Sequence, residues 1–391
     1  MRLLIVALSD SIHTVRWISQ ILDQGWDIHL FPSVDYGFDH PEFRNVTIYH
    51  SFFGKRAPKR NCVKQKGYCL KNNRLAGFVI KLQNEFFPNY RINQLKKLIK
   101  RLKPDIVHSI EFQKAAYLTL EAKDVFQGQF PPWIVTNWGS DLFLFGRLDG
   151  HEEKILRILK ESGYYSSECH RDVKLARDYG FEGVVLPVFP NAGGFDLDKT
   201  ATFRKKGKTS ERRLIMLKGY QGWAGRALAG LRALERLSDL LIGYEVVVYS
   251  AAEDVLIAAE LFTKSTGIPT RIIANGSSHE TIMRAHGKAR ISIGLSISDA
   301  ISTSLLEAIV MGSFPIQSWT SCGNEWIEDG KTGILVPPED PDIIEKAMRK
   351  ALVNDDLVDS AALINWKLAQ DKLDAKQLKK KAIAFYREVL E

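Results

Sequence analysis

The chain alternates short apolar, strand-like runs with longer helix-like segments, and it does so in both halves. Such alternation is typical of parallel sheets covered by helices on both faces. A chain of 391 residues is also too long for one ordinary hydrophobic core. The sequence therefore predicts an α/β protein with two doubly wound, Rossmann-like domains. The strand-like runs on which this prediction depends are residues 2–8, 27–31, 105–109, 133–137, 214–217, 244–249, 271–274 and 289–295.

Composition narrows the class of protein. Hydrophobic residues make up 45% of the chain and charged residues 26%, as in globular domains, and no apolar run approaches the ~18 residues of a transmembrane helix. The opening Met1–Leu8 predicts a buried strand, because no cleavage signal follows it. We therefore expect a cytoplasmic protein. Its cysteines are scattered, without metal-ligand spacing, so we expect no metal: Cys62, Cys69, Cys169 and Cys322.

The stretch from Ser296 to Gly312 carries the strongest chemical signal. It places Asp299 in a polar turn after a strand, then a hydroxyl cluster, and then Glu307 inside a short apolar helix. The first turn of a helix offers unpaired N–H groups that suit a phosphate, and a nearby carboxylate can accept hydrogen bonds from ribose hydroxyls. The alternative is structural, because Ser304 and Glu307 also fit a capping box.

The segments that follow extend this signal. Residues 313–317 form a strand-like run, Gly323-Asn-Glu comes next, and Asp329-Gly-Lys-Thr-Gly333-Ile-Leu-Val-Pro follows. This ordered series resembles the signature of the retaining glycosyltransferases of family 4, in which Asp299 stands where Glu is usual. The resemblance implies a GT-B fold with an interdomain cleft, a nucleotide diphosphate sugar as co-substrate, and no cofactor or metal. It also implies catalytic roles for Asp299, Glu307, Lys218, Arg226 and His108.

A glycine-rich turn precedes the first helix of the second half. Lys218 and Arg226 flank it and can neutralise a diphosphate, although the glycines alone also fit a plain strand-to-helix turn. The resemblance places a nucleotide base near His279. The expected donor-binding residues are Gly219, Gly222, Ser302, Thr303, Ser304, Leu305 and His279.

Three loops of the first half follow strands, where parallel sheets bind ligands. They resemble the acceptor loops of family 4. The second histidine of the family's His-x-His loop is Ile110 here, so its role is absent or has moved to Glu111. His13 and His108 are alternatively satisfied polar residues, and Asp141 a helix cap. The expected acceptor-binding residues are Ser9, Asp10, His13, Arg16, Glu111, Gly139, Ser140 and Asp141.

The region from residue 55 to 103 is strongly basic. It holds fifteen Lys or Arg against the single acid Glu85, and Phe86, Phe87 and the basic helix from Leu95 to Lys103 lie within it. Rings beside basic residues are typical of a membrane-surface segment, although a solvated helix face is the alternative. We expect an anionic membrane partner and, because no base-stacking pattern recurs, no nucleic acid. The basic loop of this region contains Lys55, Arg56, Lys59, Arg60, Lys64 and Lys66.

The predicted domains are an acceptor-binding domain at 1–197, a donor-binding domain at 198–370, and a helix at 371–391 that crosses back to the first. Residues 198–213 are polar and basic and predict a linker. The predicted function is retaining transfer of a sugar to a lipid-linked or polysaccharide acceptor, in lipopolysaccharide or capsule synthesis, at the inner face of the cell membrane. The alternatives are a sugar-nucleotide epimerase of the same architecture and a non-catalytic nucleic-acid-binding protein.

Overall fold

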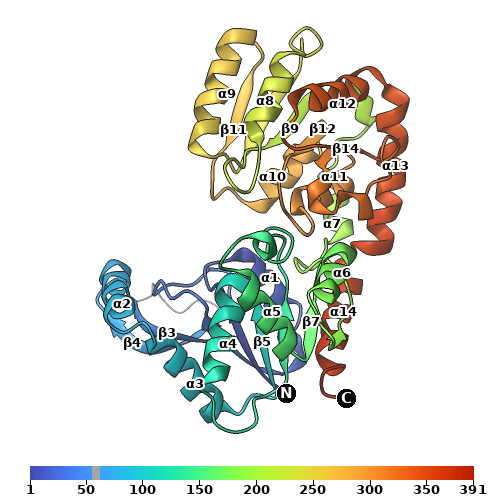
Figure 1. The fold of residues 1–391 in the computed structure, drawn as a ribbon. Coiled ribbons are helices and arrows are strands. Elements are labelled where there is room, and N and C mark those ends of the chain that lie inside the picture. Colours follow the sequence, from blue (N-terminus) through green and yellow to red (C-terminus); the bar gives the residue numbers. More distant parts are fainter. Residues whose placement is uncertain (55–61) are drawn as a thin grey trace. The chain divides into compact units, whose positions relative to one another are not determined.

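The computed structural model describes residues 1–54 and 62–391 (Figure 1). These form two compact units: residues 1–193 with 378–391, and residues 194–377. The basic side chains expected at Lys55, Arg56, Lys59 and Arg60 lie outside the described residues. None of the helices in the described ranges has both the length and the apolar character needed to cross a bilayer.

Within its described residues, the first unit is built on an eight-stranded sheet in the order β4-β3-β2-β1-β5-β6-β7-β8. Every pairing in it is parallel, as the alternating sequence predicts. The strands are β1 (Arg2–Ala7), β2 (Asp27–Pro32), β3 (Thr47–Gly54), β4 (Lys64–Leu70), β5 (Ile106–Ile110), β6 (Trp133–Thr136), β7 (Tyr164–Ser166) and β8 (Val184–Val185).

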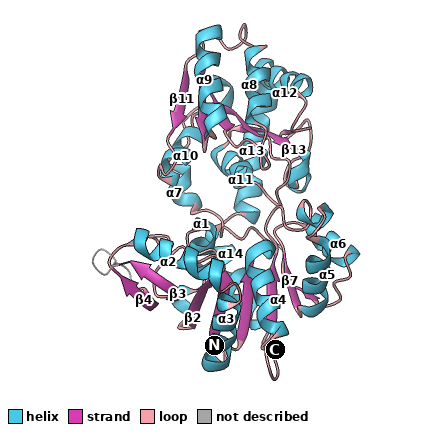
Figure 2. Cartoon of the chain, turned by 60° about the vertical axis from the view of Figure 1, so that its left-hand side comes forward, coloured by secondary structure: helices cyan, strands magenta, loops and turns pink. Residues whose placement is uncertain are grey.

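Side chains of strand β1 contribute to two hydrophobic cores, one on each face of the sheet. Successive side chains of a strand point to opposite faces. Leu3 and Ile5 pack on one face against helices α1 and α14, whereas Leu4 and Val6 pack on the other against α3, α4 and α5. Figure 2 shows these helices beside the strands of the sheet. The helices are α1 (Ile12–Ser19), α2 (Asn73–Phe86), α3 (Tyr90–Leu102), α4 (Tyr117–Asp124), α5 (Glu152–Glu161), α6 (His170–Asp178) and α14 (Ala375–Arg387), with short turns at Leu22–Gln24, Phe112–Ala116 and Phe145–Arg147.

The second unit holds a six-stranded parallel sheet in the order β11-β10-β9-β12-β13-β14. The α/β class and the doubly wound arrangement are thereby confirmed for both units. The strands are β9 (Leu214–Lys218), β10 (Glu245–Tyr249), β11 (Thr270–Ile273), β12 (Ala289–Gly294), β13 (Phe314–Ser318) and β14 (Ile334–Val336). The helices are α7 (Leu197–Ala201), α8 (Ala227–Glu235), α9 (Glu253–Thr266), α10 (His279–His286), α11 (Thr303–Met311), α12 (Pro341–Val353) and α13 (Asp355–Lys372), with short turns at Thr209–Glu211, Trp319–Ser321 and Gly323–Glu325.

Two sequence-based expectations need correction. Residues 198–213 are not a free linker, because Thr209 and Ser210 are buried and Ser210 hydrogen-bonds the carboxylate of Asp359 on α13. The last helix begins at Ala375 instead of Asp371, because α13 continues to Lys372. The first difference arises from a polar side chain that finds a tertiary partner, which local composition does not reveal.

Candidate active site

Glu307 lies in the second unit between two histidines. Its Oε1 is 2.7 Å from Nε2 of His279, and its Oε2 is 3.5 Å from Nε2 of His286. The Glu307 side chain is 6% exposed and that of His286 is fully buried, whereas His279 retains 39% exposure. His286 is held by Ser292, whose hydroxyl lies 2.8 Å from Nδ1. The arrangement is a buried carboxylate with one fixed and one accessible partner.

These neighbours determine the charge of Glu307. Burial is the largest single effect and raises the pKa of the carboxyl, but the hydrogen bonds and charges of His279 and His286 together outweigh it. The pKa of Glu307 therefore lies well below its usual range, and the group is an anion at neutral pH. An ionised carboxylate accepts hydrogen bonds and donates none, which suits the recognition of sugar hydroxyls.

Helix α11 carries Glu307 and begins differently from the expected capping box. Its N-cap is Ser302, and Glu307 is the fifth residue of the helix, so Ser304 and Glu307 do not form the reciprocal cap. The backbone N–H of Leu305 donates to the carbonyl of Ser302 within the turn. Leu305 is therefore a poor candidate for a phosphate contact, and the N–H groups of Thr303 and Ser304 are the ones that the helix start offers.

The end of β9 meets this helix start. Lys218 Nζ donates to Ser302 Oγ at 3.3 Å, and Ser302 Oγ lies 2.7 Å from Ser304 Oγ. The same ammonium lies 4.4 Å from the ring centroid of Tyr220. A cation therefore lies beside a hydroxyl pair at the positive end of a helix dipole, and all three features attract an anion.

The glycine turn after β9 has structural reasons of its own. A Cβ on Gly219 would lie 2.7 Å from the Cα of Ala251, and Gly222 has a φ of +85°. Arg226, at the end of the turn, donates to the Gly222 carbonyl and bonds Glu339 Oε1 at 2.7 Å. Arg226 is thus paired with an exposed carboxylate. Asp299 lies in the turn between β12 and α11, with its side chain partly buried.

His108 does not have the surroundings of a catalytic histidine. It is fully buried, with Nδ1 2.7 Å from the hydroxyl of Tyr386 and Nε2 2.6 Å from that of Thr136. Burial lowers the pKa of His108 to about 3, so the ring is neutral at physiological pH. In the structure His108 joins β5 to α14 through the first of these contacts, and its catalytic role stays a prediction. These contacts fit the alternative that His108 is a buried polar residue with its hydrogen bonds satisfied. One of its partners comes from the last helix, which is remote in sequence.

The three predicted acceptor loops meet at the carboxyl ends of β5 and β6. One carboxylate oxygen of Asp141 accepts from the N–H groups of Phe112 and Trp138, at 3.1 and 2.7 Å. Glu111 accepts from the N–H groups of Lys114 and Ala115, at 2.9 and 2.7 Å. Both carboxylates therefore bind the start of one helical segment, 112–124. Asp141 therefore caps a helical segment, as the alternative proposed. The segment is 112–124, which precedes Asp141 in the sequence, and not the helix that follows it.

These two carboxyls share a poorly solvated site. Burial raises the pKa of Glu111 to about 7, against the hydrogen bonds from Ala115 and Lys114. Burial and then the charge of Glu111 raise the pKa of Asp141 well above its ordinary range. Glu111 also has a φ of +75°, which is unusual for a residue with a Cβ. Two carboxyls whose ionised forms disfavour each other can retain a proton near neutral pH.

The remaining acceptor candidates lie on the first and third loops. The ring of His13 lies 5.7 Å from that of Trp138, edge to face, which joins the first loop to the third. Ser9 is buried and donates to the carbonyl of Phe38 at 3.2 Å. The others, on the first and third loops, are Asp10 (exposed), Arg16 (half-buried, on α1), and Gly139 and Ser140 (half-buried).

Two aromatic side chains near Glu307 were not identified as site residues from the sequence. His286 and Tyr249 contact each other, with ring centroids 5.4 Å apart and planes at 79°. His286 lies seven residues after His279 on α10, so both point to one face of that helix, and this spacing was available as a signal. Tyr249 ends a predicted strand and gave no local signal.

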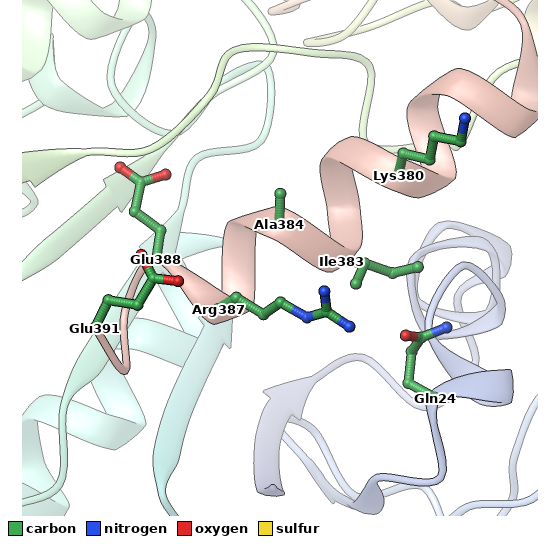
Figure 3. A pocket seen from close by; sticks show the side chains of 7 residues that line it. All are labelled: Gln24, Lys380, Ile383, Ala384, Arg387, Glu388 and Glu391. Atoms are coloured by element: carbon green, nitrogen blue, oxygen red, sulfur yellow. The ribbon is translucent and has the colours of Figure 1, made fainter.

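An open surface hollow of about 590 Å³ lies elsewhere in the first unit, along α14 (Figure 3). Its lining contains none of the predicted site residues, and its charged side chains are of both signs. We assign it no function. The lining residues are Gln24, Lys380, Ile383, Ala384, Arg387, Glu388 and Glu391.

Comparisons with known proteins agree with this geometry. Residues 2–163 match a family model described as glycosyl transferase 4-like, and residues 250–363 match one described as glycosyl transferases group 1. No curated protein matches the chain by sequence. Two matched regions that lie one in each unit define a sugar-transferring enzyme.

Solved structures of the same fold span the whole chain. A sucrose-phosphate synthase from Thermosynechococcus elongatus is 12% identical with a TM-score of 0.68, covering 100% of this chain and 99% of its own. A UDP-forming trehalose-phosphate synthase from Burkholderia xenovorans, in complex with glucose-6-phosphate, is 12% identical with a TM-score of 0.67 and full coverage of both. An Anabaena protein in complex with UDP-glucose is 10% identical with a TM-score of 0.64, covering 99% of this chain and 100% of its own. The chain is a GT-B glycosyltransferase of the family 4 type.

Proposed function

We propose that this enzyme transfers a sugar from a nucleotide diphosphate sugar, with retention of anomeric configuration, to a lipid-linked or polysaccharide acceptor. The observation that carries the donor half is the ionised Glu307 on α11, beside a helix start that bears Lys218 and the Ser302–Ser304 pair. The Anabaena neighbour in complex with UDP-glucose supports a donor of this class. Retention and the absence of a metal are proposed from the family 4 signature around Asp299 and Glu307.

The chemistry follows from the charge of the leaving group. When the sugar departs, negative charge grows on the nucleoside diphosphate, and donors already aimed at it lower the barrier. Lys218 and the N–H groups of Thr303 and Ser304 supply this stabilisation, together with Arg226 once it is released from Glu339. Removing one such donor costs about 3 to 4 kcal/mol in comparable sites. Glu307 binds the ribose hydroxyls, and Asp299 contacts the transferred sugar.

The acceptor half is proposed from the first unit. The Glu111–Asp141 pair lies at the carboxyl ends of β5 and β6, where it can accept hydrogen bonds from a hydroxyl group. A proton shared by this pair would allow one carboxyl to donate while the other accepts. The glucose-6-phosphate complex of the Burkholderia neighbour makes a phosphorylated sugar a second candidate acceptor. The basic region from residue 64 onward would attract either a phosphate or an anionic membrane, and we place the enzyme at the inner face of the cell membrane.

A thermal-shift panel tests the donor half. UDP, GDP, ADP and CMP, and their sugars, are added to the wild type and to Glu307→Ala. A true donor product at about 100 times its dissociation constant stabilises the fold by roughly 2.7 kcal/mol. We expect one nucleoside diphosphate to raise the melting temperature of the wild type, with a much smaller rise in the variant. A folded wild type that responds to no nucleotide would overturn the proposal.

Product analysis separates the alternatives. A sugar-nucleotide epimerase would change the donor sugar without any acceptor, whereas the transferase releases the nucleoside diphosphate and needs an acceptor for turnover. A nucleic-acid-binding protein would bind RNA with a steep salt dependence and ignore nucleotide sugars.

A further inference from the structure

Helix α2 exposes a row of large apolar side chains. Leu75, Phe78, Leu82 and Phe86 recur every three or four residues, so they form one stripe along the helix. Their exposed fractions are 41%, 59%, 38% and 69%, and Phe87, just beyond the helix, is 65% exposed. An amphipathic helix normally buries its apolar stripe against the core. Here α2 presents that stripe to solvent and buries only two smaller positions.

The buried positions show which way the helix is turned. Ala76 is 0% and Ile80 is 3% exposed, and these two pack toward the sheet. A Cβ on Gly37 would lie 3.1 Å from the Cβ of Ala76 and 3.3 Å from Cδ1 of Ile80, so α2 rests on the loop after β2. The small inner face anchors α2, while the rings lie on its outer side.

Positive charge surrounds this stripe. Lys64, Lys66, Lys71, Arg74 and Lys81 are all exposed, and the single acid of residues 62–87 is Glu85. Strand β4, which carries the first two lysines, is the edge strand of the sheet and lies beside α2 (Figure 1). It also bears Tyr68, which is 68% exposed. The surface of α2 and β4 therefore combines apolar rings with cations.

The sequence predicted this combination of apolar and basic side chains for the helix that the structure shows as α3, but the structure places it on α2 and β4. In α3, the apolar residues Leu95, Leu98 and Ile99 are buried in the core of the first unit. The apolar face of that helix is therefore occupied, and its lysines form an ordinary solvated face. For α3 the structure fits the alternative of a solvated helix face. The exposed apolar side chains lie on α2 instead.

We propose that α2 and β4 form a docking surface for an anionic lipid bilayer. Rings that enter the interface and cations that meet lipid phosphates are the two components of such binding. The proposal rests on the proposed function in one respect, since a bilayer at this surface would present a lipid-linked acceptor to the same unit that holds Glu111 and Asp141.

Helix α9 also exposes apolar side chains but has acidic neighbours, and this contrast shows why the positive charge around α2 indicates an anionic bilayer. It also exposes apolar side chains, with Ile257 at 64% and Leu261 at 60%. Its charged neighbours, however, are mostly acids, with Glu253, Asp254 and Glu260 against the single Lys264. An anionic bilayer repels that surface, so α9 is a matched control with equal apolar exposure and opposite charge.

The experiment is sedimentation of the full chain with phosphatidylcholine vesicles, with and without an equal share of phosphatidylglycerol. We expect the wild type to bind only the anionic vesicles, and high salt to release it. The variant pair Phe78→Ser with Phe86→Ser should bind at least tenfold more weakly. The pair Arg74→Gln with Lys81→Gln should lose about fivefold per charge. The control pair Ile257→Ser with Leu261→Ser should bind as the wild type does.

Several outcomes would overturn the proposal. They are no binding of the wild type to anionic vesicles, an equal loss in the α9 control, or no loss in either α2 pair. Sedimentation equilibrium checks the rival occupant: if the α2 variants instead abolish a dimer, the surface binds a second copy. All these side chains are exposed, so the variants should melt as the wild type does. Nucleotide-dependent stabilisation, measured on the same samples, distinguishes failure of the docking surface from failure of the proposed function.

Discussion

Glu111 and Glu307 are buried almost equally, at 7% and 5% exposure, yet their surroundings shift their pKa values in opposite directions. Burial raises the pKa of both. At Glu111 this effect prevails, because its hydrogen bonds come from two backbone N–H groups. At Glu307 two histidines reverse it, and the carboxyl stays ionised.

The difference separates two kinds of chemistry that one residue type can provide. An ionised carboxylate can bind hydroxyls firmly, whereas one that titrates near neutrality can also hold or release a proton. We therefore expect the donor side to depend on fixed charge and the acceptor side to depend on pH. Four predictions test this contrast.

The largest expected effect is that of Glu307→Gln. The amide keeps the shape and removes the charge, which leaves His286 without its buried anion. Hydrogen bonds to a charged group contribute about 1.5 to 3 kcal/mol each, and the ionised Glu307 contacts two histidines, so chemical denaturation at pH 7 should show a large loss in the free energy of unfolding. Affinity for the nucleoside diphosphate should fall about 10- to 100-fold, since a charged hydrogen bond is replaced by a neutral one.

The pH dependence of this loss provides the check. A depressed pKa contributes stability that is fully present above the unfolded value of 4.5 and is lost as pH falls. Wild type and Glu307→Gln should therefore converge in stability below pH 4.5. A constant difference down to low pH would mean that packing, not charge, explains the loss.

Glu111→Gln should act in the opposite direction. A raised pKa contributes stability that is present below the unfolded value of 4.5 and is lost as pH rises to about 7. The wild type should lose up to about 3 kcal/mol across this window, and the variant much less. A remaining decline is expected because Asp141 keeps a raised pKa of its own. Urea unfolding at pH 4.5, 6 and 8 measures the two slopes, and equal slopes would contradict the prediction.

The two histidines of the donor side should separate binding from folding. His286 is fully buried, so His286→Ala should cost about 2 to 3 kcal/mol in the free energy of unfolding. His279 is partly exposed, so His279→Ala should cost about 1 kcal/mol and chiefly change nucleotide affinity. Denaturation and nucleotide titration of both variants give the comparison. Equal stability losses would show that both histidines are structural.

The smallest effect is expected at Glu339, the partner of Arg226. The pair is largely exposed on the Glu339 side, and such ion pairs contribute about 0.2 to 1 kcal/mol. Glu339→Gln should release Arg226 and tighten nucleoside diphosphate binding by up to about fivefold. Glu345→Gln, on the nearby helix α12, is a control that should leave affinity unchanged. Weaker binding in Glu339→Gln would mean that Glu339 positions the arginine for the ligand.

The sequence was most informative where the signal was periodic. The strand-like runs predicted at residues 214–217 and 244–249 agree with β9 and β10 to within one residue at each end, because a short apolar run between turns defines a strand locally. Parallel sheets in both halves followed from alternation alone. The capping box of Ser304 and Glu307, which the sequence left open as an alternative, does not form, because the N-cap of α11 is Ser302.

Side-chain partners were less predictable. Glu307 was identified as a site residue, but its pairing with His279 and His286 depends on how α10 packs against α11. The hydrogen bond of His108 could not be predicted, because its partner, Tyr386, lies 278 residues away. The exposed stripe of α2 was missed for the same reason: spacing shows that a helix is amphipathic, but it does not show whether the core has room for its apolar side.

The position of Tyr386 has a consequence for how the protein is made. Its hydroxyl bonds both Trp17 and His108, and Leu378, Ala382 and Phe385 complete the same core. A ribosome releases these residues only after the whole second unit has been synthesised. The first unit therefore emerges early with one face of its sheet covered by α1 but not yet by α14, while the second unit can complete its own core sooner. In this chain the unit whose synthesis begins first is the one whose core is completed last.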